Sequence, residues 1–155
     1  MILTLTLLIK QHKPNETYGS TGIYIPDSAQ EKEDKGTVVA VGEDGNPAQS
    51  TIAYSIDGFN WGITGRHLFR TTGWFVAYNG IMWVGVGKGI NATPDTIAYS
   101  FDGINWVGLG YAIFTTLGLT VAWHGSYWIA GGRGTNQIAI SYDGITWTPV
   151  NEPFT

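Results

Sequence analysis

The sequence predicts an all-β fold made of repeated four-stranded antiparallel units. The chain of 155 residues is weakly charged, with 13% charged residues, but contains 22 Gly and 7 Trp. Glycine-rich turns and aromatic residues are typical of β structure. A ten-residue pattern also occurs three times along the chain. Because hydrophobic residues make up 43% of the chain, it can bury a real core, and global disorder is excluded.

The first element expected is a strand at residues 1–9. Leu3, Leu5 and Leu7 alternate with Thr4 and Thr6, which is the period of two of a half-buried strand. This segment lacks the basic start and the cleavage site of a signal peptide, and nine residues are too few to cross a bilayer. No other stretch of the sequence is long and apolar enough to cross a membrane, so we expect a soluble protein.

The composition changes near residue 45. Residues 1–45 carry 11 of the 20 charged residues and no Trp, whereas residues 46–155 carry all seven Trp and 17 of the 22 Gly. This break predicts two parts, an N-terminal segment of residues 1–45 and a β-repeat region of residues 46–155.

The second part contains an internal repeat. Residues 52–61 recur as residues 97–106 and again as residues 138–147, at offsets of 45 and then 41. The best-preserved copy predicts strands at about 74–78, 82–87, 96–101 and 105–109. Asn79-Gly80 predicts a tight type I′ hairpin between the first two strands, and Asp102-Gly103 turns the third strand into the fourth.

Four antiparallel strands in roughly 45 residues are typical of a β-propeller blade, with a β-solenoid or an open β array as the alternative. The chain holds about two and a half such repeats, preceded by a strand and a flexible loop, whereas a propeller closes with four to eight blades. An open stack exposes strand edges, so we expect a homo-oligomer or a place in a larger assembly.

Each repeat carries the motif Ser-x-Asp-Gly-x-x-Trp, and over about residues 37–150 this resembles the Asp-box of sialidase-type BNR repeats. Similar tandem copies occur in repeat proteins of large DNA viruses and phages, which makes a virion or a host cytoplasm the candidate location. The resemblance implies that Ser and Asp fix a turn while Trp packs against the hairpin. The residues concerned are Ser55, Asp57, Trp61, Ser100, Asp102, Trp106, Ser141, Asp143 and Trp147.

The residue inventory argues against catalysis. The related hydrolases need three clustered arginines and a tyrosine nucleophile paired with a glutamate. The repeat region offers only Arg66, Arg70 and Arg133, and its single glutamate is Glu152. The three histidines show no metal-ligand spacing and the chain has no cysteine, so we expect no catalytic residue, no metal and no cofactor.

The N-terminal segment carries a second set of motifs. Leu7-Leu8-Ile9-Lys10, Gly22-Ile23-Tyr24-Ile25-Pro26 and Gly36-Thr37-Val38-Val39-Ala40-Val41-Gly42 follow one another in the order of GroES-type co-chaperonins, and residues 1–43 resemble that family. The resemblance implies that Ile23, Tyr24 and Ile25 dock on a chaperonin. Tyr24 departs from the usual aliphatic residue, and the repeats begin where the co-chaperonin barrel would continue. The alternative is a flexible loop at residues 11–36.

The two resemblances meet in one strand. Val38-Val39-Ala40-Val41-Gly42 stands 45 residues before Trp83-Val84-Gly85-Val86-Gly87, so it fits the repeat as well as the co-chaperonin pattern. Whether it pairs with the repeat sheets or with the strand at residues 3–9 distinguishes the two.

The net charge and the residues expected in loops limit the kinds of partner that the chain can bind. A net charge of −4 and a pI near 5.1 make nucleic acid and anionic membranes poor partners. We expect a non-enzymatic structural or recognition module that binds protein or glycan at one end of the sheets. The alternative is a co-chaperonin-like protein that binds a chaperonin and assists folding, and the second alternative is a sialidase-like hydrolase. The candidate ligand-binding residues are Trp74, Tyr78, Asn79, Trp123, His124 and Tyr127.

Overall fold

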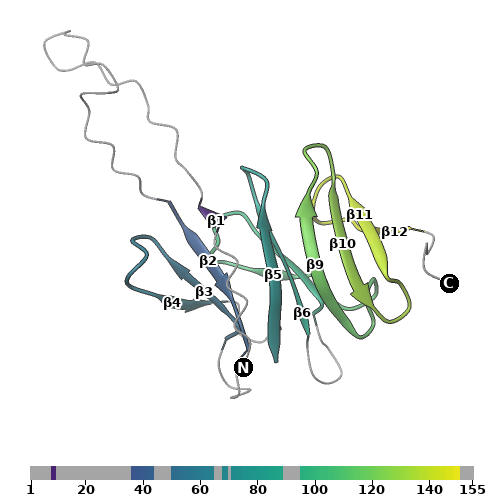
Figure 1. The fold of residues 1–155 in the computed structure, drawn as a ribbon, viewed down its shortest axis with the longest axis horizontal. Helices are drawn as coiled ribbons and strands as arrows, with labels where there is room; N and C mark the ends of the chain where they lie inside the picture. Colours follow the sequence, from purple (N-terminus) through teal and green to yellow (C-terminus); the bar gives the residue numbers. More distant parts are fainter. Residues whose placement is uncertain are drawn as a thin grey trace, which may run out of the picture.

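The computed structural model describes residues 8–9, 36–43, 50–64, 68–69, 71–88 and 95–150. All regular secondary structure in this part of the chain is β-strand, which confirms the predicted all-β class. The strands form three four-stranded antiparallel sheets in which sequence neighbours pair (Figure 1). Among the described residues no helix is long and apolar enough to cross a membrane.

The three sheets follow one another along the chain. The first contains β1 (Leu8–Ile9), β2 (Val38–Val41), β3 (Ile52–Ser55) and β4 (Gly62–Thr64). The second contains β5 (Thr72–Tyr78), β6 (Trp83–Lys88), β7 (Ile97–Ser100) and β8 (Val107–Gly108). The third contains β9 (Leu117–Trp123), β10 (Trp128–Arg133), β11 (Ile138–Ser141) and β12 (Thr148–Pro149).

The predicted strands of the middle repeat are confirmed, but the first hairpin turn differs from the expected one. Tyr78 pairs with Trp83, so the loop between β5 and β6 runs over residues 79–82, and the backbone N–H of Asn79 donates to the carbonyl of Met82 (3.2 Å), which closes the loop around Gly80 and Ile81 and not around Asn79 and Gly80. The reason is the side chain of Asn79, whose Oδ1 accepts hydrogen bonds from the backbone N–H groups of Ile81 (2.9 Å) and Met82 (2.8 Å). An asparagine side chain that caps its own loop in this way favours this turn.

Strand β2 pairs on both of its sides. Val39 lies opposite Leu8 in β1 and opposite Tyr54 in β3. The strand shared by the two sequence patterns therefore joins the N-terminal strand to the first repeat sheet. The sequence predicts about two and a half repeats, but the structure has three four-stranded sheets, because β1 and β2 complete the first sheet. This sheet unites strands from both sides of the predicted boundary at residue 45.

The sheets pack face to face through two apolar clusters. In Figure 1 the strands β2, β5 and β9 lie side by side, while β4 and β12 lie at the two outer edges. One cluster joins the first and second sheets and includes Val39, Val41, Ile52, Val76, Trp83 and Ala98. The other joins the second and third sheets and includes Val84, Val86, Ile97, Val121, Trp128 and Ala130.

Strand β6 shows how one sheet serves two interfaces. Trp83 belongs to the cluster with the first sheet, and its neighbour Val84 belongs to the cluster with the third sheet. Successive side chains of a strand point to opposite faces, so a strand buried on both sides is apolar at every position or carries glycine. This explains why Trp83-Val84-Gly85-Val86-Gly87 lacks the alternation of a half-buried strand.

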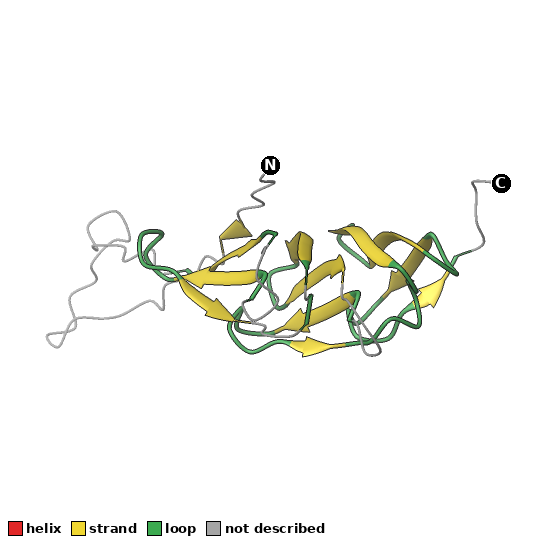
Figure 2. Cartoon of the chain, turned by 90° about the horizontal axis from the view of Figure 1, so that it is seen from below, coloured by secondary structure: helices red, strands yellow, loops and turns green. Residues whose placement is uncertain are grey.

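The described sheets do not close into a ring. Seen from below, after a turn of 90° from the view of Figure 1, they form an open row (Figure 2). The fold is therefore established as three stacked antiparallel sheets, whereas the predicted propeller is not. The predicted flexible loop lies almost entirely outside the described residues.

Removing apolar volume between two sheets should destabilise the fold far more than removing it at an outer strand. We expect Val84→Ala, at a fully buried position in β6, to lower the free energy of unfolding by about 2 kcal/mol. Val107→Ala, at a half-exposed position in β8, is the matched control and should cost less than about 0.5 kcal/mol. Urea unfolding followed by tryptophan fluorescence measures both, and equal losses would contradict the stacked arrangement.

Candidate functional site

The repeated motif builds a turn held by side-chain hydrogen bonds. In the second sheet Ser100 Oγ accepts a hydrogen bond from the backbone N–H of Gly103 (2.9 Å) and donates one to Asp102 Oδ1 (2.9 Å). The same Oδ1 accepts from the backbone N–H groups of Ile104 (2.8 Å) and Asn105 (2.7 Å). Gly103 has a φ of 78°, a backbone conformation that residues other than glycine rarely adopt. The Ser100 hydroxyl and the Asp102 carboxylate thus organise the turn together.

The first and third sheets repeat this turn. Asp57 accepts from the backbone N–H of Phe59 and Asn60, and Asp143 accepts from that of Ile145 and Thr146. The tryptophan that ends the motif differs between copies. Trp106 and Trp147 donate their indole N–H to the carbonyls of Gly103 (3.0 Å) and Gly144 (3.3 Å), whereas Trp61 is 43% exposed.

These hydrogen bonds lower the pKa of each turn carboxylate. For Asp102 burial disfavours the charged form, but the hydrogen bonds from Asn105 and Ile104 outweigh it and hold the pKa at about 2. Backbone hydrogen bonds from Thr146 and Ile145 lower the pKa of Asp143 to about 2. The side chain and the backbone of Asn60 likewise hold the pKa of Asp57 far below its ordinary value. Donors that favour the ionised form are the physical cause in all three turns.

The lowered pKa values decide what these carboxylates can do chemically. A general acid that works near neutral pH needs a pKa close to that pH, which requires a raised carboxyl pKa. The three aspartates have the opposite shift and already use their oxygens within the turn. Their geometry is that of scaffold residues.

Among the predicted ligand-binding residues, two pack against the core. The ring centroids of Tyr78 and Trp83 lie 4.6 Å apart. Those of Trp123 and Trp128, at the equivalent place in the third sheet, lie 5.2 Å apart. Trp83 and Trp128 are fully buried. Tyr78 and Trp123 therefore cover buried tryptophans, and Asn79 caps the neighbouring loop.

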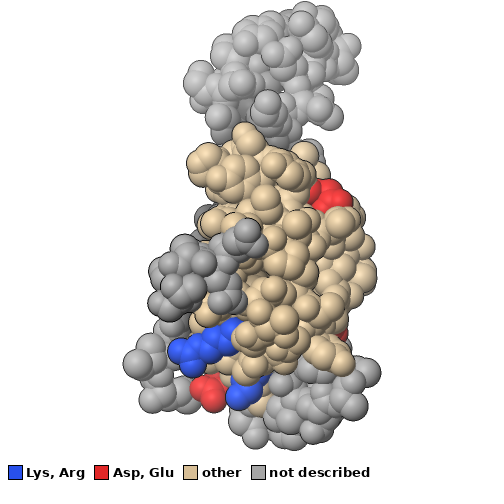
Figure 3. All heavy atoms as spheres, turned by 90° about the vertical axis from the view of Figure 1, so that its right-hand side faces the viewer, with Lys and Arg blue, Asp and Glu red and all other residues tan. Residues whose placement is uncertain are grey.

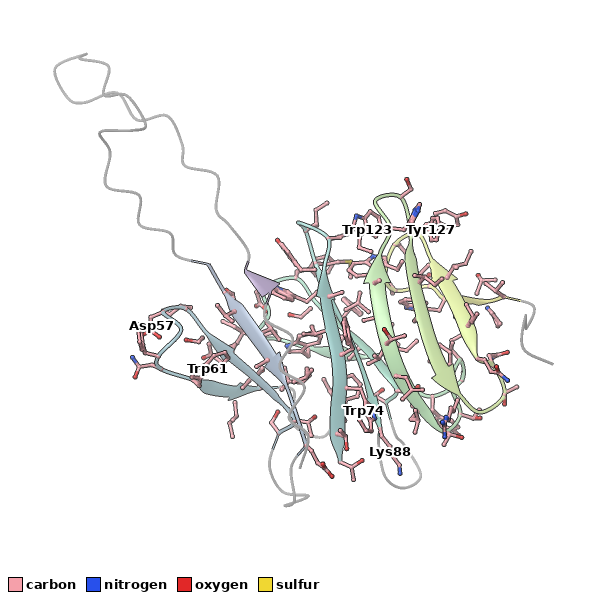
Figure 4. The ribbon with its side chains drawn as sticks, viewed as in Figure 1. Asp57, Trp61, Trp74, Lys88, Trp123 and Tyr127 are labelled. Atoms are coloured by element: carbon pink, nitrogen blue, oxygen red, sulfur yellow. The ribbon has the colours of Figure 1, made fainter. Side chains whose placement is uncertain are left out.

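Aromatic rings gather at the loop between β9 and β10. The rings of His124 and Tyr127 stack with centroids 4.7 Å apart, and Tyr142 contacts Tyr127 edge to face at 6.3 Å. Trp123 and Tyr127 lie at one end of the strands, whereas Trp74 lies toward the other end (Figure 4). The six predicted residues therefore do not form one site. Tyr142 was missed because it belongs to a different repeat motif, and its exposure could not be read from the sequence.

A small hollow lies next to this cluster. It measures about 140 Å³ and is lined by Ile140, Ser141, Tyr142, Asp143, Thr146 and Thr148. Pockets for small organic ligands usually measure roughly 300 Å³ or more, so this hollow is too small to enclose one. In the part of the chain that the structure describes, no three His, Asp or Glu side chains are grouped to hold a metal ion.

The predicted chaperonin-docking residues Ile23, Tyr24 and Ile25 lie outside the described residues, as do Arg66 and Arg70. The strands on either side of the docking segment are described. Ile9 at the end of β1 lies opposite Val38 at the start of β2. The chain therefore leaves the first sheet after Ile9 and returns to it directly alongside, with all of residues 10–37 between these two points.

The turn carboxylates should make stability depend on acid pH. Because their pKa values are lowered in the folded chain, their contribution is complete above the unfolded value of 3.8 and is lost as the pH falls toward about 2. We expect the free energy of unfolding to fall between pH 4 and pH 2, and less steeply in the Asp102→Asn/Asp143→Asn variant. Glu43→Gln, which removes a carboxylate outside the turns, is the control. An unchanged slope in the double variant, measured by urea unfolding at several pH values, would contradict this assignment.

The comparisons with known proteins point to the N-terminal part of the chain. Residues 3–57 match the family model described as Chaperonin 10 Kd subunit. The matched segment is about a third of the chain and includes β1, β2, β3 and the first turn aspartate. No curated protein and no solved structure matches the chain. The co-chaperonin resemblance of the N-terminal segment is thereby supported, and the Asp-box resemblance gains no such support.

Proposed function

We propose that the chain is a non-enzymatic, co-chaperonin-like protein that binds a chaperonin through residues Ile23, Tyr24 and Ile25. The observation that carries this proposal is the match of residues 3–57 to the Chaperonin 10 family model. The match includes the proposed docking residues and the two strands that flank them.

The pairing of β1 with β2 supports this function. A segment that presents a short apolar sequence to a partner needs a fixed base, and the antiparallel pairs Leu8 with Val39 and Ile9 with Val38 supply one. The base is anchored in the core, because Val39 is fully buried between the first and second sheets. Residues 10–37 therefore start and finish at the first sheet.

The repeat sheets serve as a scaffold in this proposal. Their aspartates are ionised and engaged in turn hydrogen bonds, which supports a structural and not a catalytic role. Three copies of one turn suit an architecture in which the same sheet is stacked repeatedly. A sialidase-like activity has no support from this arrangement.

A second candidate function is recognition of a glycan or protein ligand at the loop between β9 and β10. The observation that favours it is the aromatic cluster of His124, Tyr127 and Tyr142, since exposed aromatic faces stack on sugars and on apolar side chains. Glycan-array binding that is lost in Tyr127→Ala and kept in Tyr111→Ala, an exposed tyrosine elsewhere, would support this candidate.

Capture on an immobilised chaperonin ring, with and without ATP, tests the main proposal. We expect the wild-type chain to be retained and the Ile23→Ser/Ile25→Ser variant to lose at least tenfold in affinity, because two apolar contacts are removed. The matched control is Ile81→Ser/Val107→Ser, which changes two exposed apolar residues of the second sheet and should bind like wild type.

Two outcomes would overturn the proposal. One is a wild-type chain that does not bind any chaperonin ring tested. The other is equal binding by the wild type and the Ile23→Ser/Ile25→Ser variant, which would place the contact elsewhere on the chain. Circular dichroism of each variant verifies that its sheets are intact.

A further inference from the structure

The chain uses the same sheet-to-sheet interface twice. In the first interface Val39 of β2 faces the second sheet, and in the second interface Val84 of β6 faces the third sheet. These two residues are 45 positions apart and equivalent in the repeat, and both are fully buried. The sheet that packs on this face also contributes equivalent residues, Trp83 of the second sheet in the first interface and Trp128 of the third sheet in the second interface. Each sheet therefore has one face that receives the next sheet and one that packs on the preceding sheet.

The receiving face of the third sheet has no sheet packed on it among the described residues. Ile129 occupies the position of Val39 and Val84, but 40% of its surface is exposed, against 0% for each of the other two. Ala122, the equivalent of the buried Ala77, is also exposed. Seen from the side of β12, the described surface is mainly uncharged, with basic and acidic side chains gathered near its lower end and a further acidic side chain at the upper right (Figure 3).

The turn of each sheet provides the complementary part of the interface. A Cβ atom added to Gly103 would lie 2.9 Å from side-chain atoms of Thr37 and Val39 in the first sheet, and one added to Gly144 would lie 2.9 Å from Met82 in the second. The turn glycine thus packs closely against the preceding sheet. The equivalent glycine of the first sheet, Gly58, has nothing within 4 Å of such an atom.

The tryptophan that follows the turn shows the same difference. Trp147 is 9% exposed where the third sheet packs on the second, and Trp61 is 43% exposed on the first sheet. Phe59, two residues before Trp61, is 90% exposed. The first and third sheets therefore present the two unmatched halves of one interface, and both halves carry large apolar side chains.

We propose that a second copy of this chain fills this interface by head-to-tail association. The Gly58 turn and Trp61 of one copy pack on the receiving face of the third sheet of the other. There Tyr127 and Ile129 occupy the positions that Met82 and Val84 hold in the interface within the chain. Such a contact is heterologous, because two different surfaces meet. Two copies bring six sheets together, which lies within the four to eight sheets that close a propeller ring.

This inference is independent of chaperonin binding, because it uses only residues of the stacked sheets. Sedimentation velocity over a range of concentrations measures the assembly of the full chain. We expect the wild type to form a dimer or a larger assembly, and both Ile129→Asp and Trp61→Asp to be monomers. Val107→Asp, which places the same charge on an exposed position of β8 in the second sheet, should assemble like wild type.

Mixing the two interface variants separates head-to-tail association from a symmetric contact. Each variant keeps one intact half of the interface, so an equimolar mixture should form a complex of one Ile129→Asp chain with one Trp61→Asp chain, and nothing larger. The proposal is overturned by a monomeric wild type, by assembly that either single variant retains, or by a mixture that stays monomeric. Circular dichroism and urea unfolding show that the variants remain folded.

Discussion

The contact between a turn glycine and the preceding sheet is the constraint on which the stacked fold depends. Gly103 can approach Val39 only because it lacks a side chain and its φ is positive, and Ser100 and Asp102 hold it in that conformation. The approach also brings Thr64 Oγ1 within hydrogen-bond reach of the carbonyl of Ile104, so the first sheet donates directly to the turn of the second. A polar motif on the surface of a hairpin thereby sets how closely two apolar sheet faces can pack.

The same motif has different surroundings in each of its three copies. How far its tryptophan is buried depends on those surroundings and not on the motif itself. The hydrogen bonds of Asp57, Asp102 and Asp143 are nearly identical. The tryptophan after each turn nevertheless ranges from Trp61, which is nearly half exposed, to buried Trp147. Local sequence is therefore enough to form the turn, whereas a neighbouring sheet is needed to bury it.

Repetition made most of the fold predictable from the sequence. The strand limits of the middle repeat follow from glycine turns and an offset of 45, and β5 to β8 lie close to where these signals place them. The four-residue loop at Asn79 could not be foreseen, because it depends on where one side-chain amide finds its donors. The separation of Trp74 from Tyr127 and the double pairing of β2 also depend on tertiary packing, which the motif spacing does not encode.

The pairing of β1 with β2 also has a consequence for the order in which the chain folds. Loops of a few residues join β5 to β6 and β9 to β10, whereas residues 10–37 separate β1 from β2. Closing the longer segment costs roughly 2 kcal/mol more in chain entropy than closing a four-residue loop. Among the described residues β1 pairs with β2 through Leu8 and Ile9, and a strand paired over so short a length should dock last and detach first. A partner that restrained residues 10–37 would reduce this entropy difference and thereby stabilise the first sheet from a distance.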